Sequence, residues 1–523
     1  MIVRSEIRKL IQKFPAVAKA MTDKDFTVEI PENKVYGDYA TNVALILAKK
    51  QGKNLKEVAD KLVSDFDIRN SDFLDKIEMM NGFINFFLKK EFLQEQIKEI
   101  IKQGKKYGQS KIGKGKKAQI EFISSNPTGP LTVANGRGGP MGDVLANIFS
   151  AAGYKTEREF YVNNAGVQIA VLGHSILKDE QAQYKGEYID KLAGRISAQG
   201  EDPYEVGKKA AEIIVKEMIR KTTDKLGINY DKWFFESDLH KKNLPDKIIK
   251  ILKEKKLLYE DEGAIWFKST NFGDNRDRVL IKKDGMKTYL ANDIAYHYNK
   301  FQERKFDKVI NIWGADHHGD VPGLMAGVEA IGHKGKLEIL LTQFISVIEK
   351  GEKVKMSKRL GTFIAMDELL EAVGPDVVRF FFLMHSADKQ MDFDLDLAKE
   401  KSEKNPVYYI QYAYARTNSI LRKAKSHFVE KLDLLNHQSE KELIKCLIKL
   451  PEIIEDTAKD YQVHRLTTYA VELASAFHRF YTDCRVLGEK KELEQARLTL
   501  VKATKIVLEN VLSLMGISKP EKM

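Results

Sequence analysis

Cysteine is nearly absent from this chain. Only Cys446 and Cys484 occur among its 523 residues. Two cysteines are too few for a secreted disulfide framework, and they are also too few for a four-cysteine zinc site. Both classes of protein are therefore excluded.

Long hydrophobic runs are missing as well. The longest apolar stretches, such as residues 337–348, are interrupted by polar residues and fall short of the roughly 20 residues that span a bilayer. The first residues, MIVRSEIRKLIQKF, contain neither the apolar core nor the small-residue cleavage site of a secretory leader. We therefore expect a cytoplasmic protein with no membrane segment.

A dinucleotide fingerprint is also lacking. No G-x-G-x-x-G motif follows a strand with an acidic residue about 20 positions later. This argues against a nicotinamide-dependent oxidoreductase.

Basic residues are in moderate excess, with 86 Lys and Arg against 75 Asp and Glu, a net charge of +11 and a pI near 9.1. This excess fits a polyanionic partner such as nucleic acid. It fits equally well a lysine-rich genome or a solvated surface, so charge alone favours neither reading.

The length predicts about three or four domains. Residues 1–100 alternate helix and strand patterns, which indicates a small α+β domain. Residues 101–117 contain seven lysines and four glycines without periodicity, so we expect a flexible, exposed basic linker. Two readings of this linker stay open, a solvated hinge and a contact with RNA phosphates.

Residues 118–396 alternate strand and helix patterns, with strands expected at 118–124, 308–313 and within 337–348. This repetition predicts an α/β fold with a Rossmann-like doubly wound parallel sheet and a site at the carboxyl ends of its strands. Long charged helices at about 177–285 indicate an insertion between two halves of the sheet. Residues 397–523 show helical spacing nearly throughout and predict an all-α bundle.

A turn rich in small and polar residues follows the first strand of the sheet. It runs from Ser124 to Arg137 and reads SSNPTGPLTVANGR. Backbone N–H groups at such a turn approach phosphate closely, and the dipole of the following helix favours the anion. Because Pro140 would lose a hydrogen bond in a helix that began at Asn135, we expect that helix to begin near Gly139. Glycine-rich turns of this kind are also common structural devices.

A basic stretch, KVKMSKRLG, runs from Lys353 to Gly361. Lysines on a loop can clamp a triphosphate and neutralise the charge that develops as phosphate leaves. Without other evidence, a basic loop is more often simply solvated.

The run Asp316-His317-His318 raises the question of a metal site. Adjacent residues of an extended segment point in opposite directions, so they converge poorly on one ion. We therefore expect no protein-bound metal here, and favour hydrogen bonding to a polar ligand at a strand end.

Tyr289 and Asp293 lie four residues apart, so they can share one helix face. Asp293 could pair with a cationic substrate group. The same pattern also fits an ordinary amphipathic helix.

Together these strings resemble class I aminoacyl-tRNA synthetases, specifically the bacterial arginyl-tRNA synthetase family. The segment from Asn126 to Asn135 is similar to the family element Asn-Pro-Thr-Gly-Pro-Leu-His-x-Gly-His, and residues 355–358 read Lys-Met-Ser-Lys. Further similar strings follow in chain order, at residues 37–42, 313–319, 386–388, 392–396, 405–416 and 520–523. The resemblance covers essentially the whole chain.

The resemblance implies an N-terminal tRNA-elbow domain, a Rossmann catalytic domain and a helical anticodon-binding domain. The residues that would line an arginine pocket are Asn126, Glu236, Tyr289, Asp293 and His317. Those that would bind ATP are Thr132, Asn135, Gly136, Gly314, Asp316, Lys355, Met356, Ser357 and Lys358, and the catalytic ones among them are Thr132, Asn135, Lys355 and Lys358. Those near the anticodon would be Tyr409, Tyr412, Arg416 and Met523.

The chain departs from the family pattern at the phosphate-facing turn. Thr132 and Asn135 replace both histidines of the family element, and Ala134 replaces its glycine. A hydroxyl and an amide can still donate hydrogen bonds, each contributing about 1 kcal/mol. Three other departures carry no predicted effect: Asn164, Val167 and His385.

The resemblance implies ATP-dependent attachment of arginine to tRNA(Arg) through an arginyl-adenylate. ATP is then a substrate that carries Mg²⁺, and the protein is expected to be a monomer. The replaced histidines leave open an alternative, a catalytically weakened, synthetase-like tRNA-binding protein.

Overall fold

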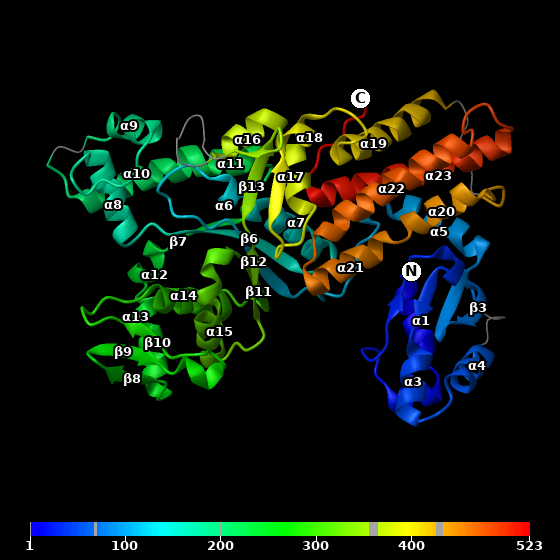
Figure 1. Cartoon of the computed structure of the whole chain (residues 1–523), viewed down its shortest axis with the longest axis horizontal. Helices are drawn as coiled ribbons and strands as arrows, with labels where there is room; N and C mark the ends of the chain where they lie inside the picture. Colours follow the sequence, from blue (N-terminus) through cyan, green and yellow to red (C-terminus); the bar gives the residue numbers. More distant parts are fainter. Residues whose placement is uncertain (1, 67–70, 198–199, 355–363, 425–431) are drawn as a thin grey trace.

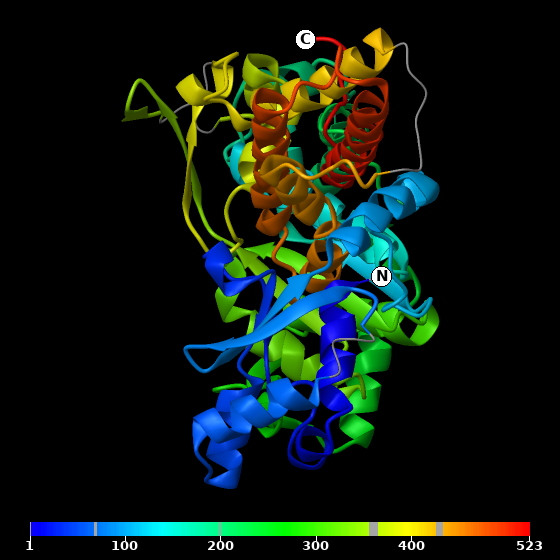
Figure 2. The ribbon, with the colours of Figure 1, turned by 90° about the vertical axis from the view of Figure 1, so that its right-hand side faces the viewer.

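A computed structural model describes residues 2–66, 71–197, 200–354, 364–424 and 432–523. The molecule is elongated, with a helical bundle at one end and the insertion-bearing part of the catalytic region at the other (Figure 1). The N-terminal domain lies beneath the helical bundle (Figure 2). Within the described ranges, no helix has the length and apolarity needed to cross a bilayer.

The central sheet has five parallel strands in the order β12-β11-β5-β6-β7. Its strands are β5 (Lys117–Glu121), β6 (Lys155–Val162), β7 (Lys232–Phe235), β11 (Lys308–Gly314) and β12 (Leu337–Thr342). The direction of winding reverses between β5 and β11, and this position opens a crevice at the carboxyl ends of the strands. The predicted doubly wound parallel sheet is therefore confirmed.

Apolar side chains explain why this sheet is central. Ala118, Ile120, Val309 and Ile310 are all fully buried, as expected for strands covered on both faces.

The long helix after β5 is α7 (Gly138–Ala151), so Pro140 lies in its first turn as expected. A short helix, α6 (Val133–Gly136), precedes it.

The insertion differs from its expected course, because β7 falls inside residues 177–285 and yet forms the fifth strand of the central sheet. Around it lie α8 (Val167–Leu177), α9 (Glu187–Ala193), α10 (Pro203–Ile214), α11 (Arg220–Lys225), α12 (Ser237–Lys241) and α13 (Leu244–Glu254). A small antiparallel sheet follows, made of β8 (Leu258–Asp261), β9 (Ala264–Phe267) and β10 (Arg278–Ile281). Two further helices, α14 (Tyr289–Tyr298) and α15 (Val321–Ala330), complete this lobe.

A second small sheet, in the order β14-β13-β15, extends beyond β12. It contains β13 (Ile345–Glu349), β14 (Glu352–Lys353) and β15 (Met391–Asp394), and its helices are α16 (Met366–Val373), α17 (Pro375–Leu383) and α18 (Leu395–Lys399).

The N-terminal region is the α+β unit that the sequence predicts. Its elements are α1 (Val3–Gln12), α2 (Pro15–Ala20), β1 (Val28–Glu29), β2 (Tyr39–Thr41), α3 (Val43–Gln51), α4 (Leu55–Asp65), β3 (Leu74–Met80), β4 (Phe83–Leu88) and α5 (Lys90–Gln103). It contacts the helical bundle through Glu452, which is 2% exposed and accepts hydrogen bonds from the Arg4 N–H (2.8 Å) and the Tyr39 hydroxyl (3.0 Å).

The helical region contains α19 (Pro406–Lys423), α20 (Gln438–Leu447), α21 (Leu450–Asp460), α22 (His464–Asp483) and α23 (Lys491–Met515). The helical pattern at 439–460 is split into α20 and α21, because Pro451 begins a new helix within it.

The basic segment 101–117 differs from the expected exposed linker. Its first residues complete α5, and Tyr107 is only 6% exposed. Backbone N–H groups of Ser110, Gly113 and Gly115 donate to the carbonyls of residues 151–153, at 2.8–2.9 Å. The segment is therefore fixed to the end of α7, while its lysines stay exposed.

Candidate active site

A cavity of about 1870 Å³ opens at the carboxyl ends of the central strands. Every strand of the sheet contributes to its wall, through Glu121, Tyr161, Phe235, Trp313 and Thr342. Eight predicted site residues from distant parts of the chain meet there: Asn126, Asn135, Glu236, Tyr289, Asp293, Gly314, Asp316 and His317.

Two carboxylates dominate one end of the cavity. Glu236 follows β7 and is 3% exposed, and burial raises its pKa. Asp293 lies on α14, where burial and the nearby charges of Glu236 and Glu121 raise its pKa to about 8. Two acidic groups confined together lower each other's tendency to ionise, so this end of the cavity is poised to receive a cation.

Two further residues, which the sequence did not single out, hold the Glu236 carboxylate. Asn292 precedes Asp293 on α14 and donates from Nδ2 to Oε1 of Glu236 at 2.8 Å. The hydroxyl of Tyr161 is hydrogen-bonded to Glu236, and burial with the neighbouring charges raises the pKa of Tyr161 well above its usual value. The Glu236 side chain is therefore fixed from two sides.

Beneath Asp293 lies a buried polar network. Lys300, which is fully buried, donates from Nζ to Glu121 at 2.5 Å and to Oδ1 of Asn311 at 3.1 Å. Asn311 donates to Nε2 of His297 at 2.9 Å, and Nδ1 of His297 donates to the Asp293 carbonyl at 2.7 Å. Burial and the Lys300 charge lower the pKa of His297, so the imidazole is neutral and fixes the backbone at Asp293.

The remaining predicted pocket residues lie around this end. Tyr289 begins α14 and is 62% exposed, one turn before Asp293 on the same wall of the cavity. The Asn126 amide donates to Oε1 of Gln168 at 3.1 Å, which ties the turn after β5 to α8. The ring of His317 lies 5.8 Å from that of Trp313.

The phosphate-facing turn is held by its own side chains. The Thr132 hydroxyl donates to Oδ1 of Asn135 at 2.7 Å, and the Asn135 N–H donates back to Thr132 Oγ1 at 3.1 Å. This reciprocal cap occupies the hydroxyl proton, and the Asn135 side chain still reaches the cavity wall. Gly136 lies beneath the turn, where a Cβ would come within 2.4 Å of the Met366 sulfur.

The predicted lysine loop is described only at its edges. Lys355, Met356, Ser357 and Lys358 lie outside the described residues. On one side, the Val354 N–H donates to the Val347 carbonyl on β13; on the other, the Val133 N–H donates to the Ile364 carbonyl at 3.0 Å.

The Asp-His-His run is not extended, contrary to the reasoning from sequence. Asp316, His317 and His318 lie on a single 3₁₀ turn, Ala315–Gly319. Among the described residues, no three His, Cys, Asp or Glu side chains are placed to hold a metal ion together.

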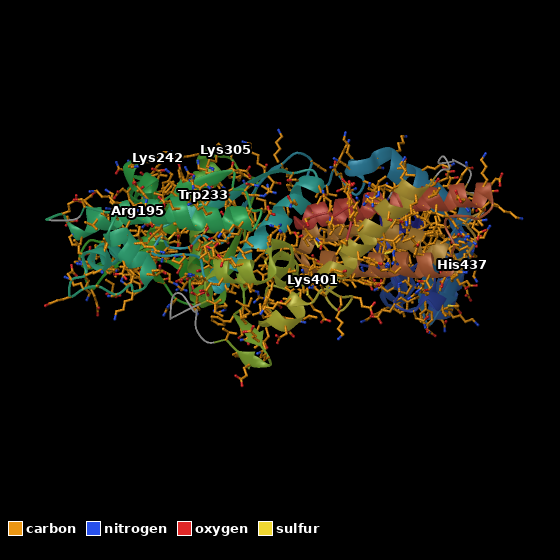
Figure 3. All side chains as sticks on the ribbon, turned by 90° about the horizontal axis from the view of Figure 1, so that it is seen from above. Arg195, Trp233, Lys242, Lys305, Lys401 and His437 are labelled. Atoms are coloured by element: carbon orange, nitrogen blue, oxygen red, sulfur yellow. The ribbon has the colours of Figure 1, made fainter. Side chains whose placement is uncertain are left out.

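A second cluster of predicted residues lies on α19 and α22 of the helical region. The Arg416 guanidinium stacks over Tyr412 at 4.5 Å and over Tyr481 at 4.8 Å, and it donates to the Tyr412 hydroxyl. Tyr409 faces inward against His478, with ring centroids 4.7 Å apart, whereas Met523 is exposed at the chain end. Trp233, on β7 of the catalytic region, and His437, just before α20 of the helical region, lie in opposite halves of the elongated molecule (Figure 3).

The three other departures from the family pattern, Asn164, Val167 and His385, lie in different surroundings. Asn164 donates to the Ser237 hydroxyl at 3.1 Å and accepts from the Ser237 N–H at 3.0 Å, directly after Glu236. Val167 begins α8 and is exposed at the cavity wall. His385 is exposed beyond α17, and nothing in the structure explains it.

Comparison with known proteins places the chain in a class. Three family models match it: "Arginyl tRNA synthetase N terminal domain" at residues 2–88, "tRNA synthetases class I (R), catalytic domain" at 190–379 and "DALR anticodon binding domain" at 410–523. The parallel sheet, its switch-point cavity and these matches define a class I aminoacyl-tRNA synthetase.

Relatives identify the family within that class. The chain is 44% identical to the arginine–tRNA ligase of Carboxydothermus hydrogenoformans, covering 95% of this chain and 94% of that one. It is 41% identical to the Bacillus subtilis arginine–tRNA ligase, covering 100% and 98% of the two chains. The solved Thermus thermophilus arginyl-tRNA synthetase has the same fold, with a TM-score of 0.82 and 21% identity over the full length of both chains. The chain belongs to the arginyl-tRNA synthetase family.

Proposed function

We propose that this chain attaches arginine to tRNA(Arg) in two steps, using ATP as substrate and passing through an arginyl-adenylate. The observation that carries the proposal is the pair Glu236 and Asp293 at one end of the switch-point cavity. A guanidinium is planar, always charged and rich in donors, so it matches two fixed carboxylates better than any other amino-acid side chain.

Asn126, Tyr289 and His317 complete the arginine site in this proposal. Arginine then lies with its side chain towards Asp293 and its carboxylate towards the turn after β5. That carboxylate attacks the α-phosphate of ATP in line, and pyrophosphate leaves. The protein contributes position and charge, and no side chain has to act as a covalent nucleophile.

The ATP site is proposed at the turn of Thr132, Asn135 and Gly136 together with Gly314 and Asp316. The Asn135 amide supplies a neutral donor beside backbone N–H groups at a helix start. Lys355 and Lys358, with Met356 and Ser357, are proposed to hold the phosphates, and Mg²⁺ arrives with ATP. Mg²⁺ supplies charge neutralisation on the phosphate oxygens when it is bound.

The N-terminal α+β region, residues 1–100, is proposed to contact the tRNA elbow, and residues 397–523 to contact the anticodon. The stacked Arg416 and Tyr412 support the second assignment, because unpaired bases stack on aromatic rings and guanidinium planes. Tyr409 and Met523 are assigned to the same contact.

Tyr412→Ala should raise the KM for tRNA about tenfold while the KM for arginine stays unchanged. An unchanged KM for tRNA in aminoacylation kinetics would refute this contact.

The deciding experiment measures attachment of radiolabelled arginine to tRNA(Arg) with ATP and Mg²⁺. We expect charging that depends on all three substrates. The second candidate, a weakened synthetase-like tRNA-binding protein, is favoured by the Thr132 and Asn135 replacements. Retained tRNA binding with no charging above background would establish that candidate instead.

A cytoplasmic monomer is also proposed. Sedimentation equilibrium should give one chain's mass, 59.7 kDa, in the absence of tRNA. A concentration-independent dimer mass would refute the monomer.

A further inference from the structure

Arg137 lies where the two short helices after β5 meet, directly after the phosphate-facing turn. It is 1% exposed, although it carries a permanent charge. Arg137 does not itself line the cavity, and among the described residues its guanidinium forms no ion pair, although the charge of Asp388 acts on it. Burying a cation that forms no ion pair is costly unless other polar groups hold it.

The guanidinium of Arg137 is bonded to four backbone carbonyls. Nη1 donates to the carbonyls of Gln343 and Phe344, the latter at 3.3 Å. Nη2 donates to those of Ser386 and Lys389, at 3.3 and 2.6 Å. These carbonyls belong to two separate segments, the crossing from β12 to β13 and the loop before β15.

Both segments lead into the small sheet β14-β13-β15. The Gln343 N–H donates to the Ala387 carbonyl at 2.9 Å, and the Met391 N–H donates to the Phe344 carbonyl at 3.2 Å, so the two segments are also bonded to each other. Arg137 therefore joins the phosphate-facing turn to the base of this sheet through a planar fork of donors.

The opposite side of the same turn is joined to the chain beyond residue 363. The Val133 N–H donates to the Ile364 carbonyl at 3.0 Å, and the Met366 N–H donates to the Leu131 carbonyl at 2.8 Å. The turn from Leu131 to Arg137 thus fixes both β13, which leads to β14, and Ile364. The Lys-Met-Ser-Lys stretch lies between these two anchored points in the sequence.

We propose that Arg137 is a positioning residue for adenylate formation, because it sets the small sheet β14-β13-β15 relative to the phosphate-facing turn. The proposal rests on the function proposed above and deepens it. Arg137 touches no substrate in this proposal, so its loss acts through the relative placement of the phosphate-facing turn and the small sheet. A misplacement of about 1 Å in such an element costs on the order of 100-fold in rate.

The test uses the full-length enzyme and tRNA(Arg), with arginine-dependent exchange between ATP and pyrophosphate as the readout of adenylate formation. Arg137→Ala should lower kcat about 100-fold, while the KM for arginine and the Kd for tRNA stay within about twofold. Added guanidinium ion should restore at least about a tenth of the rate, because it refills the four-carbonyl site. An unchanged kcat, or an equal loss in every substrate's KM, would overturn the proposal.

Arg137→Lys covers the case in which the alanine variant does not fold. An ammonium keeps the charge but cannot reach four carbonyls in one plane. We expect this variant to stay at least about tenfold below the wild-type kcat. A wild-type rate would show that charge alone matters, and would overturn the positioning role.

Arg379 supplies a matched control. It is also 1% exposed, and it donates to the Met515 and Leu226 carbonyls and to Asp143, at 2.8, 2.9 and 2.6 Å. Its partners lie away from the phosphate-facing turn, so Arg379→Ala should lower the Tm without the selective loss of kcat or rescue by guanidinium. The same kinetic signature in both variants would contradict a specific role for Arg137. Charging of tRNA(Arg) by the wild-type enzyme tests the proposed function separately. The role of Arg137 is judged from the kcat of each variant divided by the wild-type kcat.

Discussion

The two ends of the cavity differ in the charge of the side chains that line them. At one end Glu236 and Asp293 are carboxyl groups with raised pKa values, and Asn292 and Tyr161 hold Glu236 in place. At the other end Asn135 is neutral and exposed, and it is bonded mainly to the half-buried Thr132 behind it. In the proposed site, the first end selects arginine through carboxylates that are shielded from water. The second end binds the phosphates of ATP mainly through the geometry of the backbone. Substitutions at the first end should therefore have large, pH-dependent effects, and substitutions at the second end smaller ones.

The largest effect is expected at Asp293. Removing one partner of a buried ion pair costs about 4 kcal/mol, so Asp293→Ala should raise the KM for arginine on the order of 1000-fold in steady-state charging assays. Asp238→Ala is the matched control, because Asp238 also lines the cavity wall but is half-exposed and paired with Lys241. An unchanged KM for arginine in Asp293→Ala would show that Asp293 does not bind the arginine side chain.

The pH dependence of arginine binding comes next. With a pKa of about 8, Asp293 is largely protonated below pH 8 in the empty cavity, and arginine must displace that proton. The KM for arginine should therefore fall by up to about tenfold per pH unit between pH 6.5 and 7.5, and level off above pH 8. Asp293→Asn should bind arginine weakly with little pH dependence over this range. A flat wild-type profile would contradict the raised pKa.

At the neutral end, backbone placement should matter more than side chains. Gly136→Ala introduces a Cβ that would lie 2.4 Å from the sulfur of Met366, which is fully buried. The turn has to shift, and we expect kcat/KM for ATP to fall about tenfold. The double variant Gly136→Ala, Met366→Ala removes the clash and should recover part of the loss. No recovery would show that the turn itself rejects a side chain.

The smallest effect is expected at Asn135. One neutral hydrogen bond contributes about 1 kcal/mol, so Asn135→Ala should lower kcat/KM for ATP only about fivefold. Thr132→Ser keeps the hydroxyl of the reciprocal cap and serves as the control, with activity close to wild type. If Asn135→Ala lowered kcat/KM for ATP as strongly as Asp293→Ala raises the KM for arginine, the side chains of the neutral end would matter as much as those of the charged end.

Much of this cavity was predictable from the sequence. Alternating strand and helix patterns predicted the parallel sheet, and the sheet places Trp313, Phe235 and the turn after β5 at one edge. The four-residue spacing of Tyr289 and Asp293 predicted their common face, and both line the cavity. Periodicity works here because these residues belong to regular elements.

The supporting residues were not predictable, for physical reasons. Lys300 reads as a solvated lysine, yet a π-helical segment at Asn299–Glu303 follows α14, and Lys300 within it is fully buried against Glu121. Arg137 reads as one more basic residue in a glycine-rich turn. Its role depends on carbonyls more than 200 residues away, and no local pattern reports such contacts. The Lys-Met-Ser-Lys stretch lies outside the described residues, so its role stays a prediction.

The buried contact at Glu452 bears on how the chain could be divided. Burial raises the pKa of Glu452, and its partners Arg4 and Tyr39 both come from the first 41 residues of the chain. Cutting the N-terminal region away would leave Glu452 without both donors and would also remove the Arg4 partner of Asp456, a second acidic group on α21. The N-terminal region therefore supplies hydrogen bonds and charge that this face of the bundle needs, and a chain without it should be less stable than the whole protein.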